Sequence, residues 1–193
     1  MSGFHVPNCS IHSPCPIPAI QLAKISGFSP IITTASEKNT SYLRALGADT
    51  VLSRNLSTTD LTSAIAKITS KPITAVIDSI SLPQTQKLGV HLLASGGKLL
   101  TVLASTLTEA DLEGAKSTIE GLGLLRIPQN IALNEEMYHD HLSGWVERGW
   151  IKPNVVEVLE GGLEGIKEGL ERLYRGEVTA AKLVARPQEG ANV

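Results

Sequence analysis

The sequence has few aromatic residues and almost no net charge. It contains two Trp, three Tyr and two Phe in 193 residues, so an aliphatic core of the kind found in layered α/β proteins is expected. The formal net charge at pH 7 is −2, and the chain lacks the basic excess that proteins use to bind nucleic acid phosphates. No apolar run approaches the roughly 20 residues of a membrane-spanning helix. We therefore expect neither nucleic acid nor a membrane as a partner.

Cysteine is also scarce, since Cys9 and Cys15 are the only two. Two cysteines so close to one end do not make a disulfide scaffold, and a reducing intracellular setting is expected. The first residues show no basic region followed by an apolar stretch, which is the pattern of a secretory signal. The expected localisation is cytoplasmic.

Four side chains of the types that bind zinc occur within the first 15 residues: His5, Cys9, His12 and Cys15. Structural zinc sites usually take two ligand pairs from separate elements, whereas these four share one proline-rich stretch. His139 and His141 are two residues apart, which on a helix places them on nearly opposite faces. The sequence therefore predicts no metal site.

From residue 17 onward, helical patterns alternate with short apolar strands. The predicted strands are residues 31–35, 50–52, 73–78 and 99–103. The predicted helices are residues 17–25, 40–46 and 57–68, and a fourth passes through Leu88, Leu92 and Leu93. Near-continuous apolar strands separated by helices are typical of a parallel sheet with both faces covered.

The second half is less regular. A short helix is predicted from residue 108 and a longer one over residues 134–148. A strand at 155–158, an amphipathic helix at 163–173 and a strand at 182–185 complete the predicted elements.

Several short segments resemble the cofactor domain of the medium-chain dehydrogenase/reductases. They are Ala19–Lys24, Thr34–Asn39, Tyr42–Asp49, Val76–Asp78, Ala94–Leu99, Ile151–Asn154 and Lys182–Val184. The likeness covers about residues 17–186. It is closest to the zinc-free, quinone-reductase-like branch, and within that branch to fungal trans-acting enoyl reductases.

This resemblance implies an oxidoreductase that transfers hydride from NADPH to an activated C=C bond. The implied substrate is a small-molecule or carrier-bound enoyl group, such as a polyketide-like thioester, and the implied partner is a polyketide synthase. Members of the family place substrate between a GroES-like catalytic domain and the cofactor domain. We find only the cofactor domain, so we expect a truncated chain that is inactive alone, and no catalytic residue is identified.

The resemblance also predicts the domain organisation and the fold. Residues 1–18 are expected to be an irregular proline-rich leader, residues 19–186 an NADP-binding Rossmann-like domain with the family's C-terminal segment, and residues 187–193 a tail. The fold is α/β, a Rossmann-type doubly wound parallel sheet. Its first strand, which lies between the second and fourth, and its Gly-rich turn are expected to be missing. Phe4-His5-Val6 is short, and Pro7 cannot donate within a central ladder.

Two groups of residues are predicted to bind the cofactor. Ser36, Lys38, Asn39 and Tyr42 match the family's NADP positions, where hydroxyls and cations receive the 2′-phosphate that an acidic residue would repel. The alternative for this group is an ordinary helix cap with solvated neighbours.

The second group consists of Ser79, Ile80 and Leu103. Because ligands bind outside the carboxyl ends of strands in such sheets, these strand ends are expected to face the nicotinamide and its ribose. The alternative here is simple packing at the strand ends.

Two other functions remain open at this point. The chain could be a non-catalytic remnant of a reductase. It could also be a binding module that completes its sheet with a strand from a partner, because an unpaired edge is a template for such pairing.

Overall fold

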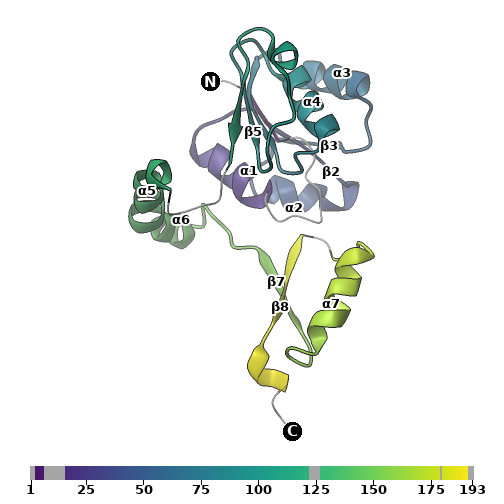
Figure 1. Cartoon of the computed structure of the whole chain (residues 1–193), viewed down its shortest axis with the longest axis vertical. Helices are drawn as coiled ribbons and strands as arrows, with labels where there is room; N and C mark the ends of the chain where they lie inside the picture. Colours follow the sequence, from purple (N-terminus) through teal and green to yellow (C-terminus); the bar gives the residue numbers. More distant parts are fainter. Residues whose placement is uncertain (1–2, 7–15, 122–126, 179, 191–193) are drawn as a thin grey trace. The chain divides into compact units, whose positions relative to one another are not determined.

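The computed structural model describes residues 3–6, 16–121, 127–178 and 180–190 (Figure 1). These residues form two compact units. Unit 1 contains the described residues up to Lys152, and unit 2 contains those from Pro153 onward.

Unit 1 is built on a six-stranded parallel sheet with the strand order β3-β2-β1-β4-β5-β6. The strands are β1 (Gly3–Val6), β2 (Ile31–Ala35), β3 (Thr50–Ser53), β4 (Ile73–Asp78), β5 (Lys98–Thr101) and β6 (Ser117–Glu120). This is the order of a doubly wound Rossmann-type sheet. The predicted fold class is confirmed.

The expected absence of the first strand is wrong. Phe4 is paired with Ile31 of β2 on one side and with Ala75 of β4 on the other, so β1 fills the central position. β1 itself, Gly3–Val6, contains no proline, so the restriction that proline places on a central ladder does not apply within it. The loop expected to carry the Gly-rich turn lies outside the described residues, and its sequence contains no glycine.

Helices cover both faces of the sheet. They are α1 (Pro16–Ile25), α2 (Thr40–Ala45), α3 (Thr58–Ile68) and α4 (Pro83–Leu92). Alternate residues of β2 point to opposite faces, so Ile31 packs with α1 and α2 while Ile32 packs with α3 and α4. The helix predicted over residues 17–25 begins at residue 16, so the expected irregular leader ends before α1 and not at residue 18.

Beyond β6, most of the described residues of unit 1 are helical. α5 (Pro128–Glu135), a π-helical turn η3 (Glu136–His141) and α6 (Leu142–Glu147) follow one another directly, so the helix predicted at 134–148 begins earlier than expected. The Gln21 side chain of α1 fixes the end of this segment. Its Nε2 donates to the Lys152 carbonyl at 3.2 Å, and its Oε1 accepts from the Lys152 N–H at 2.7 Å.

Unit 2 contains two parallel strands, β7 (Val155–Leu159) and β8 (Ala181–Ala185), and the helix α7 (Gly165–Tyr174). Gly169 brings α7 close to the strands, because a Cβ there would lie 2.7 Å from Leu159 Cδ1. No helix among the described residues of either unit is long and apolar enough to cross a bilayer.

Candidate functional site

The predicted cofactor residues lie at the carboxyl edge of the unit 1 sheet. Ser36 follows β2, Ser79 and Ile80 follow β4, and Leu103 comes two residues after β5. After β1, the chain forms β2 and β3 on one side of that strand and then crosses to form β4 on its other side. The edge between β1 and β4 is therefore the topological switch point, where doubly wound proteins bind ligands.

The polar side chains of Ser36 and Asn39, in the segment after β2, do not form helix-capping hydrogen bonds. Ser36 precedes the 3-10 turn η1 (Glu37–Asn39), and Asn39 precedes α2, but neither side chain caps the helix that follows. The strand ends on Ala35, which is buried and not acidic. Lys38 is exposed, and its ammonium forms no ion pair within the part of the chain that the structure describes.

Tyr42 lies on the next helical turn and is half-buried against the cluster formed by α1, α2 and β2. Burial raises the pKa of its phenol above the ordinary value of 10.0. Since desolvation disfavours the phenolate, the hydroxyl stays protonated at neutral pH and is able to donate a hydrogen bond.

The Leu46–Asp49 segment, which carries part of the family resemblance, has a structural role. Gly47 has φ +119, and a Cβ there would lie 2.7 Å from Lys24 Cδ. Asp49 Oδ2 accepts a hydrogen bond from the Ile31 N–H at 2.7 Å, which fixes the start of β2. This segment therefore positions the strand whose other end carries Ser36.

The end of β4 is held by a buried carboxylate. Asp78 is fully buried, and its Oδ1 accepts from the N–H groups of Ile80 at 3.0 Å and Ser81 at 2.9 Å. Its Oδ2 accepts from the Thr85 hydroxyl at 2.6 Å. Ser81 has φ 59, a left-handed conformation that is uncommon outside glycine. Asp78 thus fixes the loop that presents Ser79 and Ile80.

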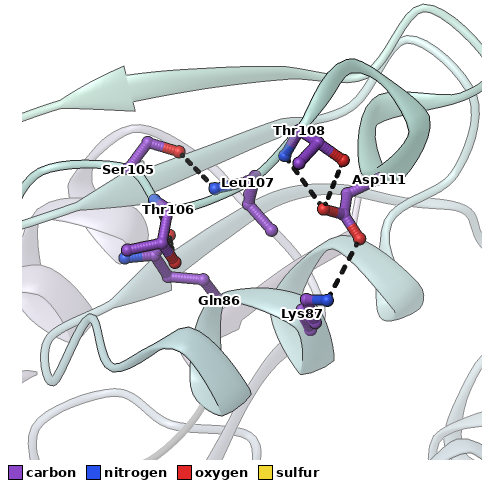
Figure 2. Close-up of polar contacts among 7 residues, drawn as sticks. All are labelled: Gln86, Lys87, Ser105, Thr106, Leu107, Thr108 and Asp111. Atoms are coloured by element: carbon purple, nitrogen blue, oxygen red, sulfur yellow. Dashed lines mark hydrogen bonds and ion pairs between the residues drawn. The ribbon is translucent and has the colours of Figure 1, made fainter.

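The loop after β5 is attached to the same group of residues. Ser81 Oγ accepts from the Val102 N–H at 2.8 Å, and Gln86 Nε2 donates to the Ala104 carbonyl at 3.1 Å. Gln86 Oε1 accepts from the Thr106 N–H at 2.8 Å (Figure 2). Sequence reasoning missed Ser81, Thr85 and Gln86. The polar residues that follow Asp78 at short spacing were the available signal.

A second polar contact fixes the far end of this loop (Figure 2). Asp111 Oδ2 accepts from both the N–H and the hydroxyl of Thr108, and Oδ1 lies 3.7 Å from Lys87 Nζ. The Thr108 hydrogen bonds, and secondarily Lys87, hold the pKa of Asp111 below its usual value. The short helix η2 (Glu109–Leu112) is therefore capped at neutral pH.

The two predicted groups share one edge but are not in contact. β1 separates β2 from β4, so Ser36 and Ser79 are two strand spacings apart, about 10 Å. Ser79 is buried, Ile80 is half-buried, and Leu103 is 58% exposed. An elongated ligand lying across the edge would reach both groups.

A cavity of about 370 Å³ lies elsewhere in unit 1, with Gln21, Lys24, Leu46 and Trp150 among its lining residues. It is next to the C-terminal ends of α1 and α2, whose carbonyl groups favour cations over phosphate. None of the predicted cofactor residues lines it.

The described residues contain no group of three or more His, Cys, Asp or Glu side chains arranged to bind a metal. Of the early cluster, Cys9, His12 and Cys15 lie outside the described residues. The prediction about this cluster stays a prediction.

The strand order and the helices on both faces define unit 1 as a Rossmann-type domain. Residues 17–123 match the family model described as zinc-binding dehydrogenase, which covers more than half of the chain. The chain therefore belongs to the zinc-binding dehydrogenase family. The matched segment corresponds to the NAD(P)-binding domain of these medium-chain oxidoreductases.

Curated relatives support the same assignment. The chain is 31% identical over 183 residues to trans-enoyl reductase RAP1 of Pyricularia oryzae, a match covering 86% of this chain and 50% of that protein. It is 28% identical over 186 residues to a zinc-type alcohol dehydrogenase-like protein of Schizosaccharomyces pombe, covering 86% and 51%. The chain spans about half the length of the curated relatives it matches.

Solved structures show the fold. A quinone oxidoreductase of Pseudomonas syringae matches with a TM-score of 0.72 and 19% identity, over 95% of this chain and 57% of that one. The JamJ enoyl reductase matches with a TM-score of 0.71 and 18% identity, over 95% and 56%. The expected resemblance to quinone-reductase-like and trans-enoyl reductases is confirmed.

Proposed function

We propose that this chain carries the NADPH-binding half of an enoyl-reductase-type oxidoreductase. The cofactor would lie along the carboxyl edge of the sheet, with its adenosine 2′-phosphate at the β2 end. Ser36, Lys38, Asn39 and Tyr42 would hold that phosphate. Bound NADPH would supply the hydride, and the protein residues would bind and orient the cofactor.

The observation that carries the proposal is the charge of Lys38, which pairs with no carboxylate among the described residues and lies beside a strand end that is not acidic. Ala35 offers no carboxylate to bind a ribose 2′-hydroxyl, which is how NAD-specific domains select their cofactor. Ser36 and Asn39 have side chains that cap no helix, and this argues against the ordinary-cap alternative. Hydrogen bonds from a cation to a phosphate are about twice as strong as neutral ones.

The first turn of α1 fits the pyrophosphate of the cofactor less well than the β2 end fits the 2′-phosphate. In Rossmann domains this group lies at the N-terminus of the first helix, where free N–H groups receive it. Here Pro16 and Pro18 occupy the first turn of α1 and contribute no N–H. The 2′-phosphate would therefore supply a larger share of the binding free energy than usual, which favours NADPH over NADH.

The nicotinamide end would lie over Ser79, Ile80 and Leu103. Hydrogen bonds of the buried side chains of Asp78 and Gln86 hold both loops in place, so Ser79, Ile80 and Leu103 would face the ring without rearrangement. The substrate class, an enoyl group on a small molecule or a carrier-bound thioester, is proposed from the trans-enoyl reductase relatives. A polyketide synthase is the partner proposed on the same ground.

The sequence also left open a binding module that completes its sheet with a strand from a partner. The reason for that alternative no longer holds. It depended on a vacant position between the second and fourth strands. β1 occupies that position.

The test is the cofactor preference of the protein and of Lys38→Ala. We expect the wild type to bind NADPH at least about tenfold more tightly than NADH, and Lys38→Ala to lose most of that ratio with little change in NADH affinity. Titration calorimetry measures both affinities. Equal affinity of the wild type for the two cofactors would overturn the proposal.

A further inference from the structure

The cavity of about 370 Å³ in unit 1 has a mainly apolar lining that the proposed cofactor site does not use. Ile25 at the end of α1 contributes aliphatic surface, and so do Ala45 and Leu46 at the end of α2. Trp150 contributes an aromatic ring, and because this side chain is 53% exposed a ligand in the cavity is able to reach it. The cavity volume lies within the range of small-molecule sites.

The cavity is at the amino edge of the unit 1 sheet. α1 ends shortly before β2 begins at Ile31, and α2 ends shortly before β3 begins at Thr50. Because β2 and β3 are parallel, their first residues share one edge, and the C-terminal ends of both helices lie there. The residues proposed to bind NADPH are at the carboxyl edge, so the cavity is a separate site.

Hydrogen bonds and a cation–π contact hold one wall of the cavity in place. Gln21 is buried in α1, and its amide makes two hydrogen bonds with the backbone of Lys152, at 3.2 and 2.7 Å. The guanidinium carbon of Arg148 lies 5.2 Å from the centroid of the Trp150 ring, which is within cation–π range. The cavity is therefore already formed without a ligand.

The charged groups around the cavity are positive. Lys24 and Lys152 line it, Arg148 lies over its aromatic wall, and the described lining residues include no Asp or Glu. The Lys24 stem lies across the end of α2, since a Cβ at Gly47 would be 2.7 Å from Lys24 Cδ. None of the three cations forms an ion pair with a carboxylate in the part of the chain that the structure describes. The cavity thus offers positive charge to an anion.

The carbonyl groups at the two helix ends oppose an anion only weakly. The N–H groups of Gly27 and Phe28 donate to carbonyls of the last turn of α1, both at 3.0 Å. Those of Gly47 and Ala48 donate to carbonyls of α2 at 3.0 and 3.1 Å. Capped carbonyls contribute less to the negative end of a helix dipole. A singly charged head group is also repelled less than a phosphate monoester, whose charge is about −1.5 to −2.

We propose that this cavity binds an aliphatic monocarboxylate of medium chain length. The chain would pack on the Trp150 ring and on the aliphatic surface at the ends of α1 and α2. Lys24 and Lys152 would bind the carboxylate. This ligand satisfies both features of the cavity, its apolar lining and its positive charge, and the inference does not depend on the proposed cofactor.

Tryptophan fluorescence reports on this cavity directly, because the chain has only two tryptophans. In Trp145→Phe, Trp150 is the only one left. Trp145 stacks on His141, and a phenyl ring preserves that contact. The emission of Trp150 in this variant is followed during titration with octanoate and, separately, with the uncharged 1-octanol.

Three further substitutions are made in the same Trp145→Phe protein. Lys24→Gln removes one charge at the cavity, and Ala45→Phe fills the cavity from an exposed position. Lys67→Gln is the matched control, because Lys67 is an exposed lysine in the last turn of α3, on the opposite face of the sheet. Thermal melting checks that each protein is folded.

We expect octanoate to change the Trp150 emission with half-saturation at about 0.1–1 mM, and 1-octanol to bind about fivefold more weakly. Lys24→Gln should weaken octanoate about fivefold, Ala45→Phe should abolish its binding, and Lys67→Gln should leave it within about twofold.

Four results would overturn the proposal. The first is the absence of a saturable response to octanoate. The second is equal affinity for octanoate and 1-octanol, which would show an apolar cavity without anion recognition. The third is an equal effect of Lys24→Gln and Lys67→Gln. The fourth is binding that survives Ala45→Phe, which would place octanoate outside the cavity.

Discussion

Asp78 is the residue that most directly fixes the nicotinamide side of the proposed site, and it does so through its carboxylate. It is excluded from solvent, yet it accepts three hydrogen bonds, two from backbone N–H groups and one from Thr85. Buried donors that lose their acceptor are costly because no water replaces it. Removing this carboxylate would therefore release the loop that holds Ser79 and Ile80.

We expect Asp78→Ala to lower the free energy of unfolding by about 3 kcal/mol, since two buried donors and one partly buried donor lose their acceptor. Asp78→Asn should cost about half as much, because the amide oxygen still accepts from Ile80 and Ser81. The Thr85 hydroxyl also donates to the Leu82 carbonyl and is able to accept from the new amide. Urea unfolding measures the difference. A cost for Asp78→Ala no larger than that for Asp78→Asn would contradict this account.

At the same scale, sequence reasoning recovered residues that lie beside strand ends but not the hydrogen bonds that fix them. Ser79 was expected at this edge because parallel strands place their carboxyl ends together, whereas Ser36 came from the family resemblance. The partners of Asp78 depend on the left-handed backbone of Ser81, which no apolar periodicity encodes.

At the scale of elements, the packing of α4 on the sheet depends on one small residue. Gly89 is buried in the helix, and a Cβ there would lie 2.7 Å from Leu99 Cδ1 and 3.2 Å from Val76 Cγ1. Both neighbours are themselves fully buried and have little room to move. The glycine thus lets α4 approach β4 and β5 closely.

We expect Gly89→Ala to destabilise the protein by about 1–3 kcal/mol, because overpacking outweighs the gain in helix propensity. Gly144→Ala in α6 is the matched control. Nothing lies within 4 Å of a Cβ at that position, so the same change should be neutral or stabilise by up to about 1 kcal/mol. Thermal melting of both variants tests the pair, and equal shifts would refute the close-packing argument.

Elements with a strong local pattern were predicted well, and those determined by their neighbours were not. β2, β4 and α3 carry apolar periodicity and were located within a few residues. β1 has only four residues, and its pairing depends on two strands that come much later in the chain. β6, with the sequence Ser-Thr-Ile-Glu, is an edge strand with one large apolar residue and shows no strand pattern.

At the scale of the whole molecule, residues 17–123 match the cofactor domain of the family, and the chain spans about half the length of its curated relatives. We therefore expect a polypeptide of these 193 residues to bind NADPH but not to reduce a crotonyl-type thioester. Positioning two reactants contributes about 7–11 kcal/mol to such a step, and we identify no described residue that would hold the substrate.

The measurement is NADPH oxidation followed by absorbance, with and without the thioester, at protein concentrations above the NADPH dissociation constant. Binding without turnover is the expected result. Turnover that depends on the thioester would show that these residues contain a substrate site that the described structure does not reveal.

The position of β1 has a practical consequence for anyone producing the protein. β1 (Gly3–Val6) is hydrogen-bonded to β2 on one side and to β4 on the other. Proteolysis that removed residues 3–6 during purification would therefore take away a strand from the middle of the sheet. Intact mass shows whether these residues are present, and it should be measured before the cofactor affinities of two preparations are compared.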